Sequence, residues 1–110
     1  MHRFNDPTLF RQQCYIDGEW SDADNSQTIE VRNPASGELL GCVPKMGVAE
    51  TRRAIEAAEA AFPAWRAKTA KERSALLRRW FELMKQNRDD LAILLTAEQG
   101  KPLAEIGRAH

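Results

Sequence analysis

The sequence predicts an α+β fold in which small antiparallel β-hairpins precede three to four helices. Up to residue 46, turn residues separate short segments rich in β-branched and aromatic residues; from residue 47 the apolar residues recur with a helical period. Helix-capping patterns at 69–72 and 87–90 support the helical half. We therefore divide the chain into an N-terminal arm (1–13), a hairpin segment (14–46) and a truncated helical segment (47–110).

The composition indicates one small ordered unit without a strong net charge. The 110 residues include 16 basic and 16 acidic side chains, a balance that argues against a nucleic-acid or anionic-membrane surface. No apolar run approaches the roughly 18 residues that span a bilayer, and the N-terminus has no apolar stretch typical of a secretory signal. Cys14 and Cys42 lie far apart, so we expect two free thiols and a cytoplasmic location.

Two hairpins are expected in the first half of the chain. In 14–20, Asp17 and Gly18 favour a type I′ turn, in which both central residues have φ > 0. The alternating segment 28–32 is joined to a partner strand at 38–44 by a turn rich in Asn, Pro and Gly. We expect these segments to form one small sheet of three or four strands.

Three helices follow. Pro63 should end or kink the first near Ala61. The second begins with the capping box of Thr69 and runs to about residue 86, and the third uses Asn87 as its N-cap and ends at Gly100. A fourth begins near residue 101. The apolar face of the first helix contains Val48, Thr51, Ile55, Ala58, Phe62 and Trp65, and that of the second Leu76, Leu77, Trp80, Phe81, Leu83 and Met84; Trp65, Trp80 and Phe81 are expected in the core.

Few residues have the pattern of a catalytic or metal site. Cys14 and Cys42 are expected to be small core residues of strands, and His2 and His110 lie at the chain ends, so neither a Cys/His pair nor a zinc site is expected. Glu98 is an acid in the last turn of a helix, where the helix dipole disfavours it. Its carboxylate either makes a salt bridge or a hydrogen bond to a loop backbone, or it joins backbone carbonyls of residues 31–33 in an oxygen-ligand site for a hard metal ion.

Several segments, read together, resemble the N-terminal quarter of the aldehyde dehydrogenase superfamily. They are YIDGEW (15–20), VRNPASGE (31–38), RSALL (73–77) and LTAEQGKP (95–102). The ordered resemblance covers about residues 9–105, and EQGKPLAE (98–105) is especially similar to the succinate-semialdehyde dehydrogenase branch.

The resemblance implies a parent enzyme that oxidises an aldehyde to a carboxylate with NAD⁺ or NADP⁺, using a cysteine nucleophile and a glutamate that activates water. It implies that this segment leads a Rossmann-like domain and that the parent is a homo-oligomer. The family's catalytic and dinucleotide-binding residues lie further along the chain, so no catalytic or cofactor-binding residue is assigned here and no cofactor is expected for this segment. A structural monovalent cation near Val31 and Glu98 is also implied.

The last five residues depart from the family pattern, with Gly107 inside the expected fourth helix. We therefore expect an inactive N-terminal fragment, whose partner is the remainder of the enzyme. The alternative is a stand-alone helical interaction module. A fragment should expose a large apolar area, whereas a module should close its own core.

Overall fold

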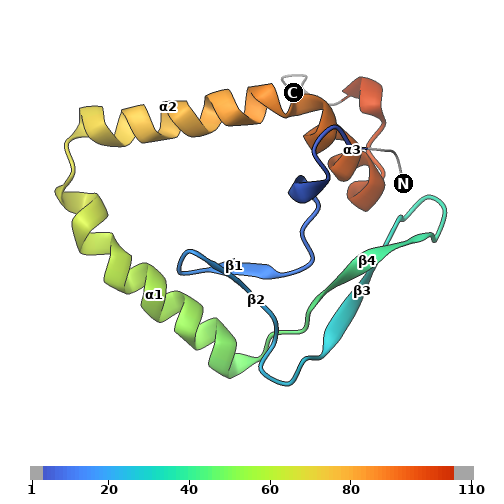
Figure 1. The fold of residues 1–110 in the computed structure, drawn as a ribbon, viewed down its shortest axis with the longest axis horizontal. Coiled ribbons are helices and arrows are strands. Elements are labelled where there is room, and N and C mark those ends of the chain that lie inside the picture. Colours follow the sequence, from blue (N-terminus) through green and yellow to red (C-terminus); the bar gives the residue numbers. More distant parts are fainter. Residues whose placement is uncertain (1–3, 106–110) are drawn as a thin grey trace.

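The computed structural model describes residues 4–105 and shows two hairpins followed by three α-helices (Figure 1). This order confirms the predicted fold class. The strands do not form one sheet, however: β1 pairs only with β2, and β3 only with β4. The elements are β1 (Cys14–Ile16), β2 (Glu19–Ser21), β3 (Thr28–Arg32), β4 (Leu39–Pro44), α1 (Val48–Ala67), α2 (Ala70–Gln86) and α3 (Arg88–Gln99), with 3₁₀ turns at Pro7–Leu9 and Leu103–Glu105.

The helices and hairpins enclose a central opening. In Figure 1, α1 and α2 meet end to end at a corner, and α3 returns toward the N-terminal arm and the β3–β4 hairpin. The radius of gyration is 16.8 Å, whereas a compact domain of this length has about 13 Å. The accessible surface is 8650 Å², against about 6,200 Å² for a compact chain of this mass. The chain therefore exposes about 2,400 Å² more than a closed domain would.

The hairpins form as their turn residues predict. Asp17 and Gly18 both have positive φ, 51° and 78°, so the β1–β2 turn is the expected type. Gly37 ends the β3–β4 turn with φ 77°. Gly41 in β4 has a close neighbour: a Cβ there would lie 2.6 Å from Gln12 Oε1. That oxygen accepts a 3.0 Å hydrogen bond from the Cys42 N–H, which ties the N-terminal arm to β4.

The sequence predicts that Pro63 ends or kinks the first helix; α1 continues through Pro63, so the first of these two outcomes is wrong. Proline removes one backbone donor, but its φ of about −65° suits a helix, and the chain on both sides keeps its other hydrogen bonds. The helix ends at Ala67, and the N–H of its C-cap residue Lys68 donates a 3.1 Å hydrogen bond to the Trp65 carbonyl.

The caps of α2 and α3 differ in chemistry. Thr69 and Glu72 make the predicted capping box at the start of α2, with bonds of 3.0 and 3.1 Å. Asn87 is the N-cap residue of α3, but its side chain makes no capping bond; its Nδ2 donates to the Leu83 carbonyl at 2.9 Å. Asn87 is therefore the N-cap residue that the sequence predicts, but without the side-chain capping bond, because the preceding helix ends at the same residue and offers free carbonyls.

The segment after α3 turns sharply at Gly100, as the sequence predicts. Gly100 has φ 82°, and a Cβ on it would lie 3.2 Å from Pro34 Cγ in the β3–β4 turn. Thr96 Oγ1 donates to the Lys101 carbonyl at 2.6 Å and fixes the direction of the chain beyond the turn. The described part of the expected fourth helix is the 3₁₀ turn Leu103–Glu105; its remainder lies outside the described residues. Within residues 4–105, no helix has the length and apolarity needed to cross a membrane.

Replacing Gly100 tests this corner. Gly100→Ala should destabilise the fold by about 1 kcal/mol, because alanine resists a left-handed conformation and because its Cβ would press on Pro34. Gly100→Asn is the matched control, since asparagine tolerates this conformation better. The thermal midpoint followed by far-UV circular dichroism should fall more for alanine than for asparagine; equal midpoints would contradict the proposed strain.

Candidate functional site

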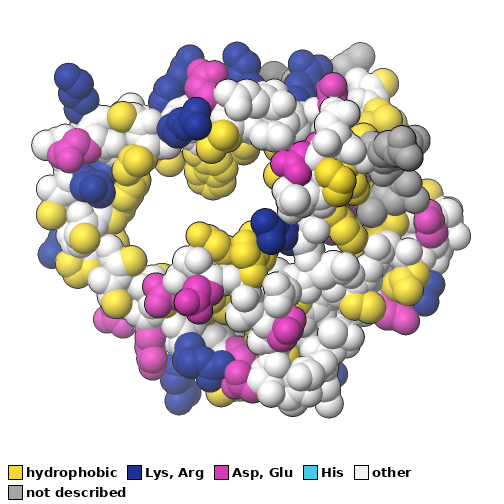
Figure 2. Space-filling model, viewed as in Figure 1, with side chains coloured by type: hydrophobic (Ala, Val, Ile, Leu, Met, Phe, Trp, Pro, Cys, Tyr) yellow, Lys and Arg dark blue, Asp and Glu magenta, His cyan; other side chains and the backbone are white. Residues whose placement is uncertain are grey.

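The most unusual feature of the described surface is the uncovered apolar face of α2. Trp80 is 61% exposed, although its position on the amphipathic helix predicts burial. Apolar side chains gather around the central opening, beneath α2 and beside the hairpins (Figure 2). We call the following residues the α2 apolar face, all at least 40% exposed: Leu76, Leu77, Trp80, Phe81, Leu83 and Met84.

The apolar face of α1 is also uncovered. Val48 is 76% exposed, and Ile55, Phe62 and Trp65 are exposed as well. The expectation that Trp65, Trp80 and Phe81 are core residues is therefore wrong for this chain, because all three side chains are exposed. Among the described residues, the buried apolar side chains are all small: Ala23, Pro44 and Ala97.

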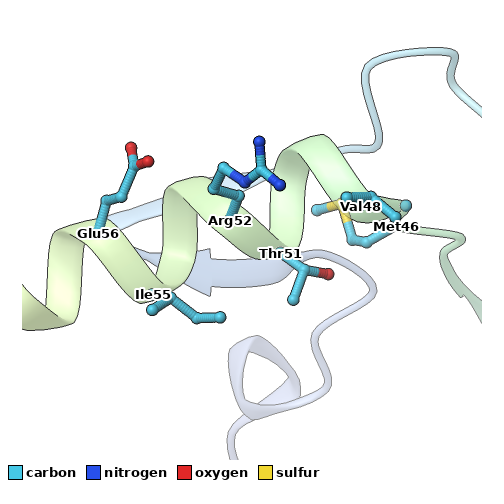
Figure 3. Close-up of a pocket in the computed structure, with 7 residues that line it drawn as sticks. Met46, Val48, Thr51, Arg52, Ile55 and Glu56 are labelled. Atoms are coloured by element: carbon cyan, nitrogen blue, oxygen red, sulfur yellow. The ribbon is translucent and has the colours of Figure 1, made fainter.

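A shallow groove of about 710 Å³ lies at the start of α1. Figure 3 shows that its side chains leave the helix on opposite sides, Arg52 and Glu56 on one and Thr51 and Ile55 on the other. A wide groove with one apolar side is better suited to contact with another protein surface than to a small ligand, because small ligands are normally enclosed on most sides. It is lined by Met46, Gly47, Val48, Thr51, Arg52, Ile55 and Glu56.

Two buried carboxylates hold the hairpin half and the helical half together. Asp90, in the first turn of α3, is 3% exposed and accepts hydrogen bonds of 2.8 Å from the N–H groups of Asn5 and Asp6. Each oxygen takes one bond, so the N-terminal arm is fixed to α3 by a charge-assisted pair. The sequence indicated Asp90 only as an acid suited to the helix dipole; its long-range role was not predicted.

Glu50 plays the corresponding role at α1. It is 7% exposed, and its carboxylate accepts 3.2 Å bonds from the N–H groups of Asp24 and Gly47. A salt bridge of 2.7 Å between Arg53 Nη2 and Asp24 Oδ1 stabilises the same loop. A glutamate at the third helical position was the available signal, but glycine in place of the usual Ser or Thr at the N-cap concealed the motif.

These contacts lower the pKa of Glu50. The main cause is the hydrogen bond from its own backbone N–H, followed by that from Asp24; burial opposes the shift, and the Gly47 N–H and the charge of Arg53 add to it. A carboxyl whose pKa is lower in the folded chain stabilises the fold above its unfolded pKa. That stabilisation is lost as the pH falls from about 4.5 through the lower folded value.

Val31 and Glu98, the predicted cation ligands, lie on the same small cavity. Its volume is about 10 Å³, close to the space that one water molecule needs. The carboxylate of Glu98 has no hydrogen bond or ion pair with the other described residues, and Gln12 and Arg11 also line the cavity. Carboxylate and carbonyl oxygens suit a hard cation, but two such ligands are fewer than a complete shell, and Arg11 brings a competing positive charge.

The described residues offer no other reactive centre. Cys14 and Cys42 are free thiols and half-buried, and no cluster of three His, Cys, Asp or Glu side chains within residues 4–105 could hold a metal ion. His2 and His110 lie outside the described residues. The described part of the chain has no glycine-rich turn between a strand and a helix.

An open ring with bare helix faces and without a reactive centre among its described residues is the arrangement of one segment of a larger fold. The family model described as "Aldehyde dehydrogenase family" matches residues 20–109. The chain therefore belongs to the aldehyde dehydrogenase family, and it is the N-terminal part of that fold.

Individual relatives are very similar to the chain. It is 74% identical over 103 residues to the glutarate-semialdehyde dehydrogenase of Pseudomonas putida (strain KT2440), covering 94% of this chain and 22% of that protein. It is 63% identical to the NADP(+) succinate-semialdehyde dehydrogenase GabD of Escherichia coli (strain K12), covering 94% and 21%. A crystal structure of succinate-semialdehyde dehydrogenase from Burkholderia pseudomallei matches with a TM-score of 0.91 and 64% identity, covering 94% and 22%. The chain thus spans about a fifth of these relatives' lengths.

The hydrogen bonds that the Glu50 carboxylate accepts from Asp24 and Gly47 can be tested by varying the pH. Glu50→Gln should lower the protection factors of the Asp24 and Gly47 amides in hydrogen exchange at neutral pH, because the charged acceptor is lost. In the native sequence these protection factors should decline as the pH falls below about 4.5, and in the variant they should not.

The matched control is Glu59→Gln on the exposed part of α1, which should leave both protection factors and their pH dependence as they are. The same acid-dependent decline in the Glu50→Gln variant would show that another group is responsible.

Proposed function

We propose that this chain forms the N-terminal segment of an NAD(P)-dependent semialdehyde dehydrogenase that oxidises succinate semialdehyde to succinate, and that the chain alone does not turn over. The proposal rests on the bare faces of α1 and α2 in a family member that spans about a fifth of its relatives. Cys14 lies in β1 and Cys42 in β4, and both are half-buried free thiols.

Glutarate semialdehyde is the second candidate substrate. The 74% identical relative carries that substrate in its name, and the two semialdehydes differ by one methylene. One methylene changes binding by only about 1–3 kcal/mol, so a pocket can be tuned between them by few residues. We place that pocket in the polypeptide that follows this segment in the relatives.

The stand-alone interaction module fits the structure less well. A module should bury its own apolar residues, yet the described chain exposes about 2,400 Å² more than a compact domain. Its largest aromatic side chains on α1 and α2 are among the exposed ones.

The remaining organisation follows from the same proposal. We place the arm (1–13), the hairpin segment (14–46) and the helical segment (47–110) in one incomplete N-terminal domain of a cytoplasmic homo-oligomeric enzyme. We further propose that Val31 and Glu98 contribute oxygen ligands to a structural monovalent cation in that enzyme, supported by their position on one small cavity. Further ligands would come from water or from the rest of the enzyme.

A chimeric enzyme tests the function. The matched 103-residue segment of the E. coli relative is replaced by the corresponding residues of this chain, and the same exchange is made in the P. putida relative. Both chimeras should reduce NAD(P)⁺ at rates close to those of their parents, because the segment supplies structure rather than reacting groups. The substrate preference between succinate and glutarate semialdehydes should follow the parent enzyme.

The isolated 110-residue chain is the companion measurement and should reduce no cofactor with either semialdehyde. Turnover by the chain alone, or folded chimeras without activity, would refute the proposal.

The cation can be tested in the E. coli chimera. At equal ionic strength, Na⁺ or K⁺ should raise its thermal midpoint above that in tetramethylammonium, because only small ions fit the cavity and binding stabilises the folded state. Glu98→Gln should remove this difference, whereas Glu59→Gln, which removes a carboxylate elsewhere, should keep it. A cation effect that survives Glu98→Gln would assign the ion to another site.

A further inference from the structure

We propose that the described part of the N-terminal arm, residues 4–13, is a lid over the small cavity between β3, β4 and α3, and that Asp90 is the latch that keeps this lid closed. The inference goes beyond the proposed function, because it concerns how the cavity opens, whatever the cavity holds. One consequence rests on the proposed cation: an ion in this cavity would enter and leave when the lid lifts.

The arm forms part of the wall of the cavity. The volume of about 10 Å³ admits no more than a water-sized guest. Figure 1 shows the arm, in blue, running from beside α3 toward β1. Gly41 allows the arm to approach β4 closely, because a Cβ there would lie 2.6 Å from Gln12 Oε1 and 3.0 Å from Phe10 Cζ. The arm contributes Phe10, Arg11 and Gln12 to the lining, and the other elements contribute Val31, Cys42 and Glu98 among others.

The contact between the lid and β4 is a side-chain hydrogen bond. Gln12 Oε1 accepts a 3.0 Å bond from the Cys42 N–H. Among the described strands β4 pairs with β3 alone, so this N–H lies on the free edge of β4, where the lid supplies its acceptor. The Gln12 side chain is exposed, and one exposed neutral bond contributes little to stability by itself. The lid therefore needs a stronger attachment to remain closed.

Asp90 provides that attachment at the other end of the arm. Its side chain is buried, and its two carboxylate oxygens accept bonds of 2.8 Å from the N–H groups of Asn5 and Asp6. Hydrogen bonds to a charged acceptor are about twice as strong as bonds between neutral groups. The position of the lid should therefore depend on Asp90 more than on Gln12.

A compact segment connects the latch to the cavity. The rings of Phe4 and Phe10 stack with their centroids 6.1 Å apart and their planes 15° apart. Between them lies the 3₁₀ turn Pro7–Leu9, which Asp6 caps by accepting a 3.0 Å bond from the Thr8 N–H. Phe4 directly precedes the residues that Asp90 holds, and Phe10 lines the cavity. We therefore expect residues 4–10 to move as one unit.

The chain after the lid is fixed beside β1. Gln13 Nε2 donates a 3.2 Å hydrogen bond to Asp22 Oδ1, and β1 begins at the next residue. Release of the latch would therefore swing the lid about Gln13 and uncover the cavity.

Hydrogen exchange of the Cys42 amide tests the lid in a chimera that carries residues 1–105 of this chain in place of the corresponding part of the E. coli relative. Asp90→Asn removes the charge and one acceptor oxygen, so the Cys42 amide should exchange about tenfold faster. Mass spectrometry with fragmentation to single residues gives the rate. The internal reference is the Gly37 amide, which donates to the Asn33 carbonyl at 2.8 Å in the β3–β4 turn and should keep its rate.

Two further variants separate the latch from general effects. Asp89→Asn makes the same chemical change at the neighbouring exposed acid and should leave both rates as they are. Phe4→Ala keeps Asp90 but removes the ring stacking with Phe10, and it should accelerate exchange at Cys42 several-fold without affecting Gly37.

Each outcome bears on a separate part of the proposal. An unchanged Cys42 rate in an Asp90→Asn chimera that retains activity would overturn the lid and leave the proposed function standing. Equal acceleration at Cys42 and Gly37 would indicate general unfolding; Phe4→Ala then decides, and an unchanged Cys42 rate in that variant would overturn the lid. Acceleration by Asp89→Asn as large as that by Asp90→Asn would overturn the assignment of the latch to Asp90.

Discussion

The arrangement of this chain depends on two buried carboxylates that accept hydrogen bonds from distant backbone N–H groups. Asp90 binds the N-terminal arm to α3, and Glu50 binds the loop before β3 to the start of α1. A buried charge is costly unless it is fully hydrogen-bonded, and here both carboxylates meet two or more N–H donors. Because the chain buries so few apolar side chains, these polar links fix its geometry to an unusual degree.

The small number of buried apolar side chains also explains how this segment can form part of a larger fold. The helices are formed by local forces, namely alanine-rich sequence, caps and the left-handed stop at Gly100. Their apolar faces then remain available for the rest of the enzyme. A segment built in this way can shape a larger domain without contributing a nucleophile or a cofactor-binding loop.

Local features of the structure could be predicted wherever short-range chemistry decides them. The Asp17–Gly18 turn, the Thr69 cap and the Gly100 stop each depend on neighbours a few residues away, and all three are confirmed. Asn87 is the predicted N-cap but makes no side-chain capping bond, because two helices share that residue. Pro63 does not end α1, because a single missing donor did not outweigh the helix around it. The pairing of the strands into two separate hairpins depends on contacts between residues far apart in the sequence, and the alternation within each strand does not predict such contacts.

The sequence by itself determined the family, the order of hairpins and helices, and which face of each helix is apolar, because turn chemistry and hydrophobic period are local properties. Only the tertiary structure decided that Trp80 and its neighbours are uncovered, and that Glu50 and Asp90 join the two halves of the chain. The physical reason is that burial and long-range hydrogen bonding depend on what lies opposite a residue in space. The period of an amphipathic helix indicates a face that needs a partner, and it does not identify the partner.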